Sequence, residues 1–258
     1  MQRRFLWVPS SLSGMEWRER DGVRWLEAEL PGARAAFSTR VGGVSEAPYE
    51  ALNVGILTGD ERAGVRENRL RLASALGREP QGVVMARQVH GAEVRTHEEP
   101  QEPRVYADAV PSPDRVDAHS TTSRELTPLV IVADCLPVAM AGPGGVVMAH
   151  CGWRGLAGGI VAVAAGSVQA EAAAVGAGIG PCCYEVGDEV LSEFEDLDGV
   201  AQGRMLDLTA VATALLGAAG VTAVESAGLC TSCNPELFYS HRRDGERTGR
   251  QAGLVWMD

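Results

Sequence analysis

The sequence predicts an α/β fold of the α+β type, a layered sandwich of mixed β-sheet with flanking helices. Short apolar segments of strand length alternate along the chain with segments of helix length, which is typical of layered α/β proteins. The chain has 258 residues, of which 45% are hydrophobic, enough to form a sizeable core. No internal repeat interrupts it. We therefore expect residues 1–258 to form a single domain, with the Pro- and Glu-rich residues 98–113 as a surface excursion.

Turn and capping signals define the first elements. Asp21-Gly22 predicts a hairpin turn between strands at residues 18–20 and 23–27. Asp60 as N-cap, with a glycine and a proline beyond the far end, predicts a helix over residues 61–76. Apolar runs and their flanking turn residues then predict strands at 34–39, 83–89, 129–133, 146–149, 172–177, 223–227 and 254–257, and helices at 156–170, 188–196 and 208–218.

Charge narrows the classes of partner. The formal net charge of -11 repels nucleic acid and anionic membranes, so we expect neither as a partner. All 23 basic residues other than histidine are arginines. The lack of lysine excludes a P-loop lysine and Schiff-base chemistry. Any phosphate must therefore be recognised by arginine or by backbone N–H groups.

The N-terminal segment and the cysteines predict a cytoplasmic protein. Residues 5–8 are too short for the apolar core of a signal peptide, and no apolar run approaches the ~18 residues that span a membrane. Six cysteines in such a chain are expected to be reduced thiols that serve as ligands, nucleophiles or core residues.

Three residues share one local context. His90, Cys135 and His150 each follow an apolar, strand-like run and precede turn-forming or polar sequence. Sites in open α/β sheets form beyond the carboxyl ends of strands, so the three side chains can converge. Taken singly, each would more often be a core residue. Together, a thiolate and two imidazoles suit a catalytic zinc ion with a fourth position open for water or substrate.

Arginines supply candidate anion sites. Arg154 stands in residues 150–155, which lead directly into a predicted helix whose free N–H groups favour an anion. Arg40 lies at a strand end beside Gly42-Gly43, and residues 240–243 form a third basic cluster. An isolated arginine is more often solvated or paired with a carboxylate.

Two further features are interpreted as structural. Cys230 and Cys233 form a lone CxxC, and Cys182-Cys183 has the wrong spacing for the second pair of a zinc ribbon. We interpret these thiols as structural, with a redox role as the alternative. His97 lies in an acidic stretch and is expected to be exposed and without function.

The chain resembles the YfiH-type family, long described as multicopper polyphenol oxidases (laccases) and now associated with purine nucleoside phosphorylase activity. The matching segments run in order from residue 37 to the C-terminus. They are residues 37–40 with 42–45, 49 with 52–55, 88–91, 133–138, 150–155, 178–187, 238–243 and 248–251.

The resemblance implies a site and a reaction. The zinc ligands of the family fall on His90, Cys135 and His150, and copper is possible in the same site because its affinity for such ligands exceeds that of zinc. The implied substrates are inorganic phosphate and the purine nucleosides adenosine, inosine, guanosine and S-methyl-5'-thioadenosine. The implied reactions are phosphorolysis and the hydrolytic deamination of adenosine. We expect phosphate at Arg40 and Arg154, with polar contacts from Ser38 and Asn53.

Two residues depart from the family pattern. Cys151 stands where a small residue such as alanine is common, which places a second thiol beside a predicted ligand. His119 stands where an aliphatic residue is expected, as a local substitution or an extra contact.

Three alternatives stay open at this point. A copper-dependent, laccase-like oxidase would need many more histidines than the five present. A metal-free cysteine hydrolase would activate Cys135 through His90 or His150. A non-enzymatic binding protein would hold a structural zinc and turn over no nucleoside. Metal analysis and incubation with adenosine, with and without phosphate, distinguish them.

Overall fold

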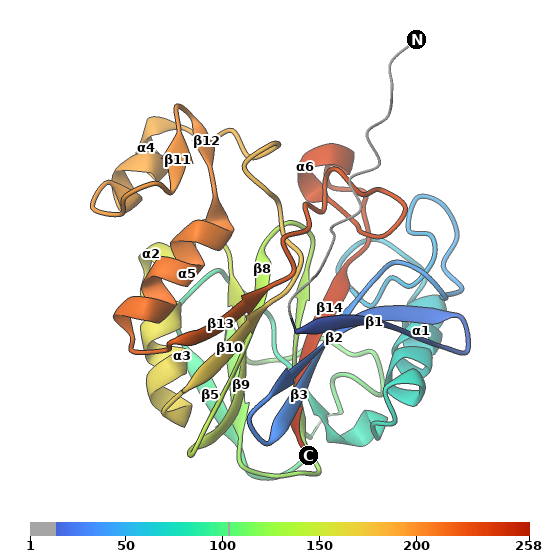
Figure 1. The fold of residues 1–258 in the computed structure, drawn as a ribbon. Coiled ribbons are helices and arrows are strands. Elements are labelled where there is room, and N and C mark those ends of the chain that lie inside the picture. Colours follow the sequence, from blue (N-terminus) through green and yellow to red (C-terminus); the bar gives the residue numbers. More distant parts are fainter. Residues whose placement is uncertain (1–13, 103) are drawn as a thin grey trace.

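The computed structural model describes residues 14–102 and 104–258, which form two six-stranded sheets and a short ribbon (Figure 1). The first sheet has the order β1 (Met15–Arg20), β2 (Val23–Leu30), β3 (Ala33–Ser38), β14 (Gln251–Met257), β7 (Thr127–Val132) and β4 (Val83–Val84). The second has the order β13 (Ala223–Ser226), β10 (Ala172–Val175), β8 (Leu136–Gly142), β9 (Gly145–Cys151), β6 (Ala118–Thr121) and β5 (Val94–His97). The ribbon pairs β11 (Ala201–Gln202) with β12 (Met205–Leu206).

Six α-helices flank the sheets in the described part of the chain. They are α1 (Arg62–Ala75), α2 (Trp153–Ala157), α3 (Ile160–Val168), α4 (Asp188–Leu191), α5 (Leu208–Ala218) and α6 (His241–Asp244), with 3-10 turns at Pro80–Gly82 and Ser192–Phe194. Within residues 14–102 and 104–258, no helix combines the length and the hydropathy needed to cross a membrane.

The core has three parts that define four layers. The inner faces of the two sheets pack on each other, with Phe37 and Val255 from the first sheet and Met148 from the second. Helix α1 covers the outer face of the first sheet, and α2, α3 and α5 cover the outer face of the second (Figure 1). Among the strands that the structure describes, three pairs are parallel and the others antiparallel, so the predicted mixed sandwich is confirmed.

Several predicted elements are confirmed, and four are corrected. The hairpin turn at residues 21–22 and helix α5 form as predicted. The strand predicted over residues 83–89 ends at Val84. The helix predicted over 156–170 starts earlier and breaks at Gly158-Gly159, where Gly159 has a φ of 86°. The segment at 188–196 is one short helix followed by a 3-10 turn.

Helix α1 also begins differently from the expectation. Its N-cap is Glu61 rather than Asp60, and no side chain caps it. The Asp60 carboxylate instead accepts hydrogen bonds from the Ser45 hydroxyl at 2.6 Å and the Asn53 amide at 2.8 Å. Strands β5, β6 and β8 were not predicted, because β5 and β6 are four-residue segments with polar side chains, and β8 contains Pro137 and small residues.

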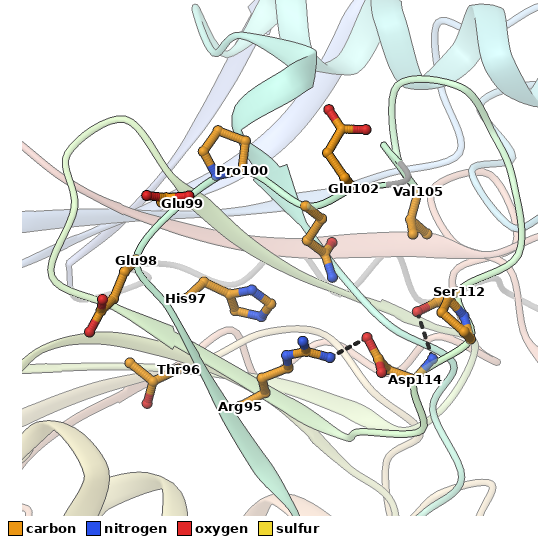
Figure 2. A pocket seen from close by; sticks show the side chains of 12 residues that line it. Arg95, Thr96, His97, Glu98, Glu99, Pro100, Glu102, Val105, Ser112 and Asp114 are labelled. Atoms are coloured by element: carbon orange, nitrogen blue, oxygen red, sulfur yellow. Dashed lines mark hydrogen bonds and ion pairs between the residues drawn. The ribbon is translucent and has the colours of Figure 1, made fainter.

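The stretch from His97 onward is less exposed than expected. Val105 and Tyr106 are 3% and 1% exposed and belong to the core beneath α1. His97 is also buried, and its Nε2 lies 3.0 Å from Nδ1 of the fully buried His119. Figure 2 shows the His97 ring in a polar pocket, beside the ion pair of Arg95 and Asp114. His97 and His119 thus form a buried pair that is separate from the predicted metal ligands.

The buried histidine pair makes the fold sensitive to acid. Burial, reinforced by nearby positive charge, lowers the pKa of His97 to about 4 and that of His119 to about 3. Unfolded histidines protonate near pH 6.5. Below that pH the unfolded state binds more protons than the folded state, so stability is lost as the pH falls towards 4.

We therefore expect the unfolding free energy, measured by urea titration from pH 7 to pH 4, to fall less steeply in His119→Gln than in the wild type. The difference in slope should approach about 1.4 kcal/mol per pH unit. Equal slopes would show that His119 does not titrate as the structure implies.

Candidate metal centre

Three side chains that are distant in sequence meet at one edge of the sandwich. His90 lies in the loop between β4 and β5, Cys135 in the connection from β7 to β8, and His150 near the end of β9. Their ligand atoms all lie within 4.8 Å of one another. The two imidazole rings have centroids 4.8 Å apart and meet edge to face. The structure thus brings together the three predicted ligands, although His150 lies within its strand rather than after it.

The positions of His90 and Cys135 depend on unusual backbone conformations. His90 has a φ of 62° and Asp134, which precedes Cys135, has a φ of 91°. Residues other than glycine seldom adopt this left-handed region, so surrounding contacts must hold them there. Asp134 accepts hydrogen bonds of 2.6 Å from the Thr231 hydroxyl and from the backbone N–H of Arg242. These bonds fix the turn that presents Cys135.

The His90 loop is tied to the first sheet as well. The Gln88 side chain donates to the carbonyl of Ile131 and accepts from its N–H, both at 2.8 Å. This two-bond contact with β7 sets the position of the chain two residues before His90.

Asp117 organises the centre and was not predicted. Its fully buried carboxylate accepts hydrogen bonds of 2.9 to 3.0 Å from the N–H groups of Val89, His90 and Gly91. It also lies 2.8 Å from Nδ1 of His150. Burial alone would raise the pKa of the Asp117 carboxyl, but the hydrogen bonds from His150, Gly91 and Val89 hold it below its ordinary value.

The contact between Asp117 and His150 determines the tautomer. An ionised carboxylate only accepts, so Nδ1 of His150 carries the proton and Nε2 is left to bind a metal. Carboxylates that hold metal-binding histidines in this way are common around zinc.

Electrostatics favours the thiolate of Cys135. Burial would raise its pKa, but the charges and hydrogen bonds of His150 and His90 outweigh burial and lower it to about 6. Burial would lower the pKa of His150, but Cys135 and Asp117 raise it to about 9, so a metal ion at Nε2 would displace a proton from this ring. A thiolate and two imidazoles are the donors that zinc and copper prefer, so the residues present fit such an ion.

The three side chains line a cavity of about 670 Å³. Apolar side chains, among them Met85 and Ile131, form part of its wall. The basic part of the wall was only partly predicted. It consists of Arg69, Arg87, Arg154, His241, Arg242 and Arg250.

Three arginines of this wall are held by different contacts. Arg154 is exposed and stacks on Trp153, with Cζ 4.1 Å from the ring centroid. Arg242 stacks on Tyr184 at 5.0 Å. Arg69 is 1% exposed, and its Nη2 makes no hydrogen bond among the described residues.

The other predicted site residues lie outside the cavity lining. Arg40 donates to the carbonyls of Glu50 and Pro235 and stacks on Tyr239, 4.6 Å from the ring centroid. The buried Ser38 hydroxyl accepts the N–H of Ala252. These contacts belong to the framework, because Ser38 at the end of β3 and Arg40 in the bend after it both bond to segments of the C-terminal part of the chain.

Asn53 is fully buried and contacts the cavity only through a neighbouring residue. Its side-chain oxygen accepts the N–H of Arg250 at 2.9 Å, and Arg250 does line the cavity. Asn53 therefore positions a cavity residue and does not reach the cavity itself.

The structure also shows where the remaining cysteines and histidines of the sequence analysis lie. Cys151 is buried in the core beneath the helices, on the opposite face of β9 from His150, so it is not beside the ligand atoms. His119 pairs with His97, which corrects the expectation of an exposed His97. The interpretation of Cys230 and Cys233 as a lone pair is wrong, because Cys182 and Cys183 lie beside them.

Gly152 gives a steric test of the centre. A Cβ at this position would meet Cys135 Sγ at 2.9 Å and His90 Cδ2 at 3.0 Å. Its φ of -84° suits alanine, so the conflict is with the ligands alone. We expect Gly152→Ala to lose most bound metal after dialysis, measured by mass spectrometry of metals. Gly166→Ala, whose Cβ meets nothing within 4 Å, should keep it. Equal metal content would contradict this geometry.

Asp117 gives an electrostatic test. In Asp117→Asn one acceptor oxygen becomes an NH₂ group that faces backbone donors, so the His90 loop and the His150 ring lose their support. We expect the metal affinity, measured by competition with a chelator, to fall about 10- to 100-fold. Asp114→Asn, which removes only the ion pair with Arg95, is the matched control and should leave the affinity unchanged.

Comparison with known proteins places the chain in a family. Residues 34–258 match the family model described as multi-copper polyphenol oxidoreductase laccase. The purine nucleoside phosphorylase PA4543 of Pseudomonas aeruginosa is 37% identical over 255 residues, covering 90% of this chain and 98% of the relative. The purine nucleoside phosphorylase YfiH of Escherichia coli is 36% identical over 241 residues, covering 88% and 94%.

Solved structures agree. The crystal structure of YlmD from Geobacillus stearothermophilus superposes with a TM-score of 0.84 at 33% identity, covering 93% of this chain and 97% of that one. That of the Bacillus licheniformis hypothetical protein YfiH has a TM-score of 0.82 at 29% identity, covering 94% and 99%. The chain therefore belongs to the laccase-like family that includes the YfiH and YlmD proteins.

Proposed function

We propose that this chain is a zinc-dependent purine nucleoside phosphorylase that also deaminates adenosine. Its substrates would be inorganic phosphate with adenosine, inosine, guanosine or S-methyl-5'-thioadenosine. The names of the relatives support the phosphorylase class. The observation that carries the proposal is the convergence of His90, Cys135 and His150 with arginines on one cavity.

The cavity suits a nucleoside together with phosphate. Its volume of about 670 Å³ falls within the range of about 300–1,000 Å³ that is usual for small-molecule sites. Met85, Ile131 and Ile179 offer apolar contact area to a purine ring. We infer that the whole described chain serves as one catalytic unit, because the lining comes from both sheets and from α6.

Phosphate recognition falls to arginines of the cavity wall. Arg154, predicted from the sequence, is joined there by Arg242 and Arg250. Arg69 lies in the same wall, and its Nη2, which has no hydrogen-bond partner within residues 14–102 and 104–258, has the chemistry to bind an anion. We assign Arg40, Ser38 and Asn53 to the framework that supports this wall. Holding phosphate beside the ribose would lower the barrier by positioning and by charge stabilisation.

His90, Cys135 and His150 would hold the zinc. A zinc ion with three protein ligands lowers the pKa of a bound water to about 7, which supplies a nucleophile for deamination. Asp117 holds the His150 proton on Nδ1, and the left-handed turn at Asp134 keeps Cys135 facing the cavity.

One observation favours the cysteine hydrolase as a second candidate. The low pKa of Cys135, about 6, is what a nucleophilic thiol needs. A laccase is less well supported, because the described residues hold no further cluster of three or more metal-ligating groups that includes histidine. The metal content of protein purified without added copper, with a test for metal-free activity, separates these candidates.

The proposal is tested with adenosine. In the presence of phosphate we expect adenine and ribose 1-phosphate, and without phosphate we expect inosine. Arg154→Ala should reduce kcat/KM for phosphate about 10- to 100-fold, because a charge-assisted hydrogen bond contributes about 1.5–3 kcal/mol. Arg71→Ala, which removes an exposed arginine paired with Glu67 on α1, is the matched control. No purine product under either condition would overturn the proposal.

A further inference from the structure

A second group of thiols lies outside the proposed active site. Cys182 and Cys183 follow β10, and Cys230 and Cys233 follow β13. These two strands are parallel neighbours, so the loops after them leave the sheet at the same edge. All four Sγ atoms lie within 4.8 Å of one another.

Backbone contacts hold the two loops in register. The N–H of Thr231 donates to the carbonyl of Gly178 at 2.9 Å. The N–H of Gly180 points at Cys230 Sγ, 3.2 Å away. The four thiols therefore meet through ordered main chain and not through the chance orientation of long side chains.

The separations suit a single metal ion. A tetrahedral zinc with Zn–S bonds of about 2.3 Å holds its sulfur atoms about 3.8 Å apart. Here Cys233 Sγ lies 3.4 Å from Cys182 Sγ and from Cys183 Sγ, and every pair lies within 4.8 Å. A polynuclear iron–sulfur cluster would need a wider cage, because its own atoms separate the thiolates.

We propose that Cys182, Cys183, Cys230 and Cys233 bind one structural zinc ion, distinct from the ion at His90, Cys135 and His150. Without a metal these side chains are thiols, and four adjacent thiolates could form only with a cation to offset their mutual repulsion. Zinc is the ion that a tetrahedral set of four thiolates most commonly holds as a closed structural site. Zinc binding releases the thiol protons and changes no oxidation state.

The ion would brace one wall of the cavity. Tyr184 directly follows Cys183 and lines the cavity, where Arg242 stacks on it. Thr231 lies between the other two cysteines and donates to Asp134, which precedes the ligand Cys135. The four-thiolate ion would thus fix two elements of the active site without touching substrate.

Metal stoichiometry tests this proposal. Wild-type protein purified with zinc should hold two ions per chain, and Cys182→Ser/Cys233→Ser should hold one. Cys135→Ser should lose the other ion. Cys151→Ala, which changes the buried cysteine outside both groups, should keep both. Unchanged zinc content in Cys182→Ser/Cys233→Ser would overturn the proposal, as would a disulfide among these four cysteines in wild type purified with zinc under reducing conditions.

Cobalt substitution gives a second readout on the same variants. Thiolate-to-cobalt charge-transfer absorption grows with the number of bound thiolates. It should remain strong in Cys135→Ser and fall sharply in Cys182→Ser/Cys233→Ser. The reverse pattern would contradict a four-thiolate site.

The wild type together with Cys135→Ser keeps the test decisive if Cys182→Ser/Cys233→Ser fails to fold. Stepwise titration with an organomercurial thiol reagent should release zinc in two phases, followed with a metal-sensitive dye. A single phase of one ion that Cys135→Ser abolishes would overturn the four-thiolate site. A single phase that Cys135→Ser preserves would support it and would count against the proposed catalytic zinc.

Discussion

The Asp117 carboxylate connects the two segments that carry His90 and His150, and the candidate centre depends on their relative position. It receives the N–H groups of the His90 loop, fixes the tautomer of His150, and is itself sealed from water. A buried carboxylate needs such partners, since an unpaired charge in the interior is strongly destabilising. The loop before β5 and the end of β9 are consequently held together by one charge. The groups that donate hydrogen bonds to Asp117 stabilise its buried charge. The same hydrogen bonds fix the positions of His90 and His150.

The convergence of His90, Cys135 and His150 could be predicted from the sequence. Histidine and cysteine carry distinctive chemistry, and each of the three follows an apolar run, so a shared edge was a sound expectation. Asp117 was missed because an aspartate before a polar segment looks like any solvated turn residue. Only the packing of three separate segments shows that it is buried.

Other misses have the same physical origin. The four-cysteine group depends on β10 and β13 being neighbours, a pairing that no local spacing encodes. In the sequence, Arg40 lies beside a turn, a position that suits a phosphate ligand. In the fold, its contacts with Tyr239 and Pro235 hold it outside the cavity lining. The lack of lysine, in contrast, was fully informative, because it required any phosphate site to be built from arginine and backbone N–H groups.

The position of Cys135 has a consequence for the molecule as a whole. It stands on the connection through which the chain passes from β7 in the first sheet to β8 in the second. Any sliding of one sheet over the other would displace this sulfur relative to His150, which belongs to the second sheet alone. The metal affinity of the centre would therefore depend on how the two sheets are aligned. Substitutions deep in the inter-sheet core, far from any ligand, would tune metal affinity through the fit of the sandwich.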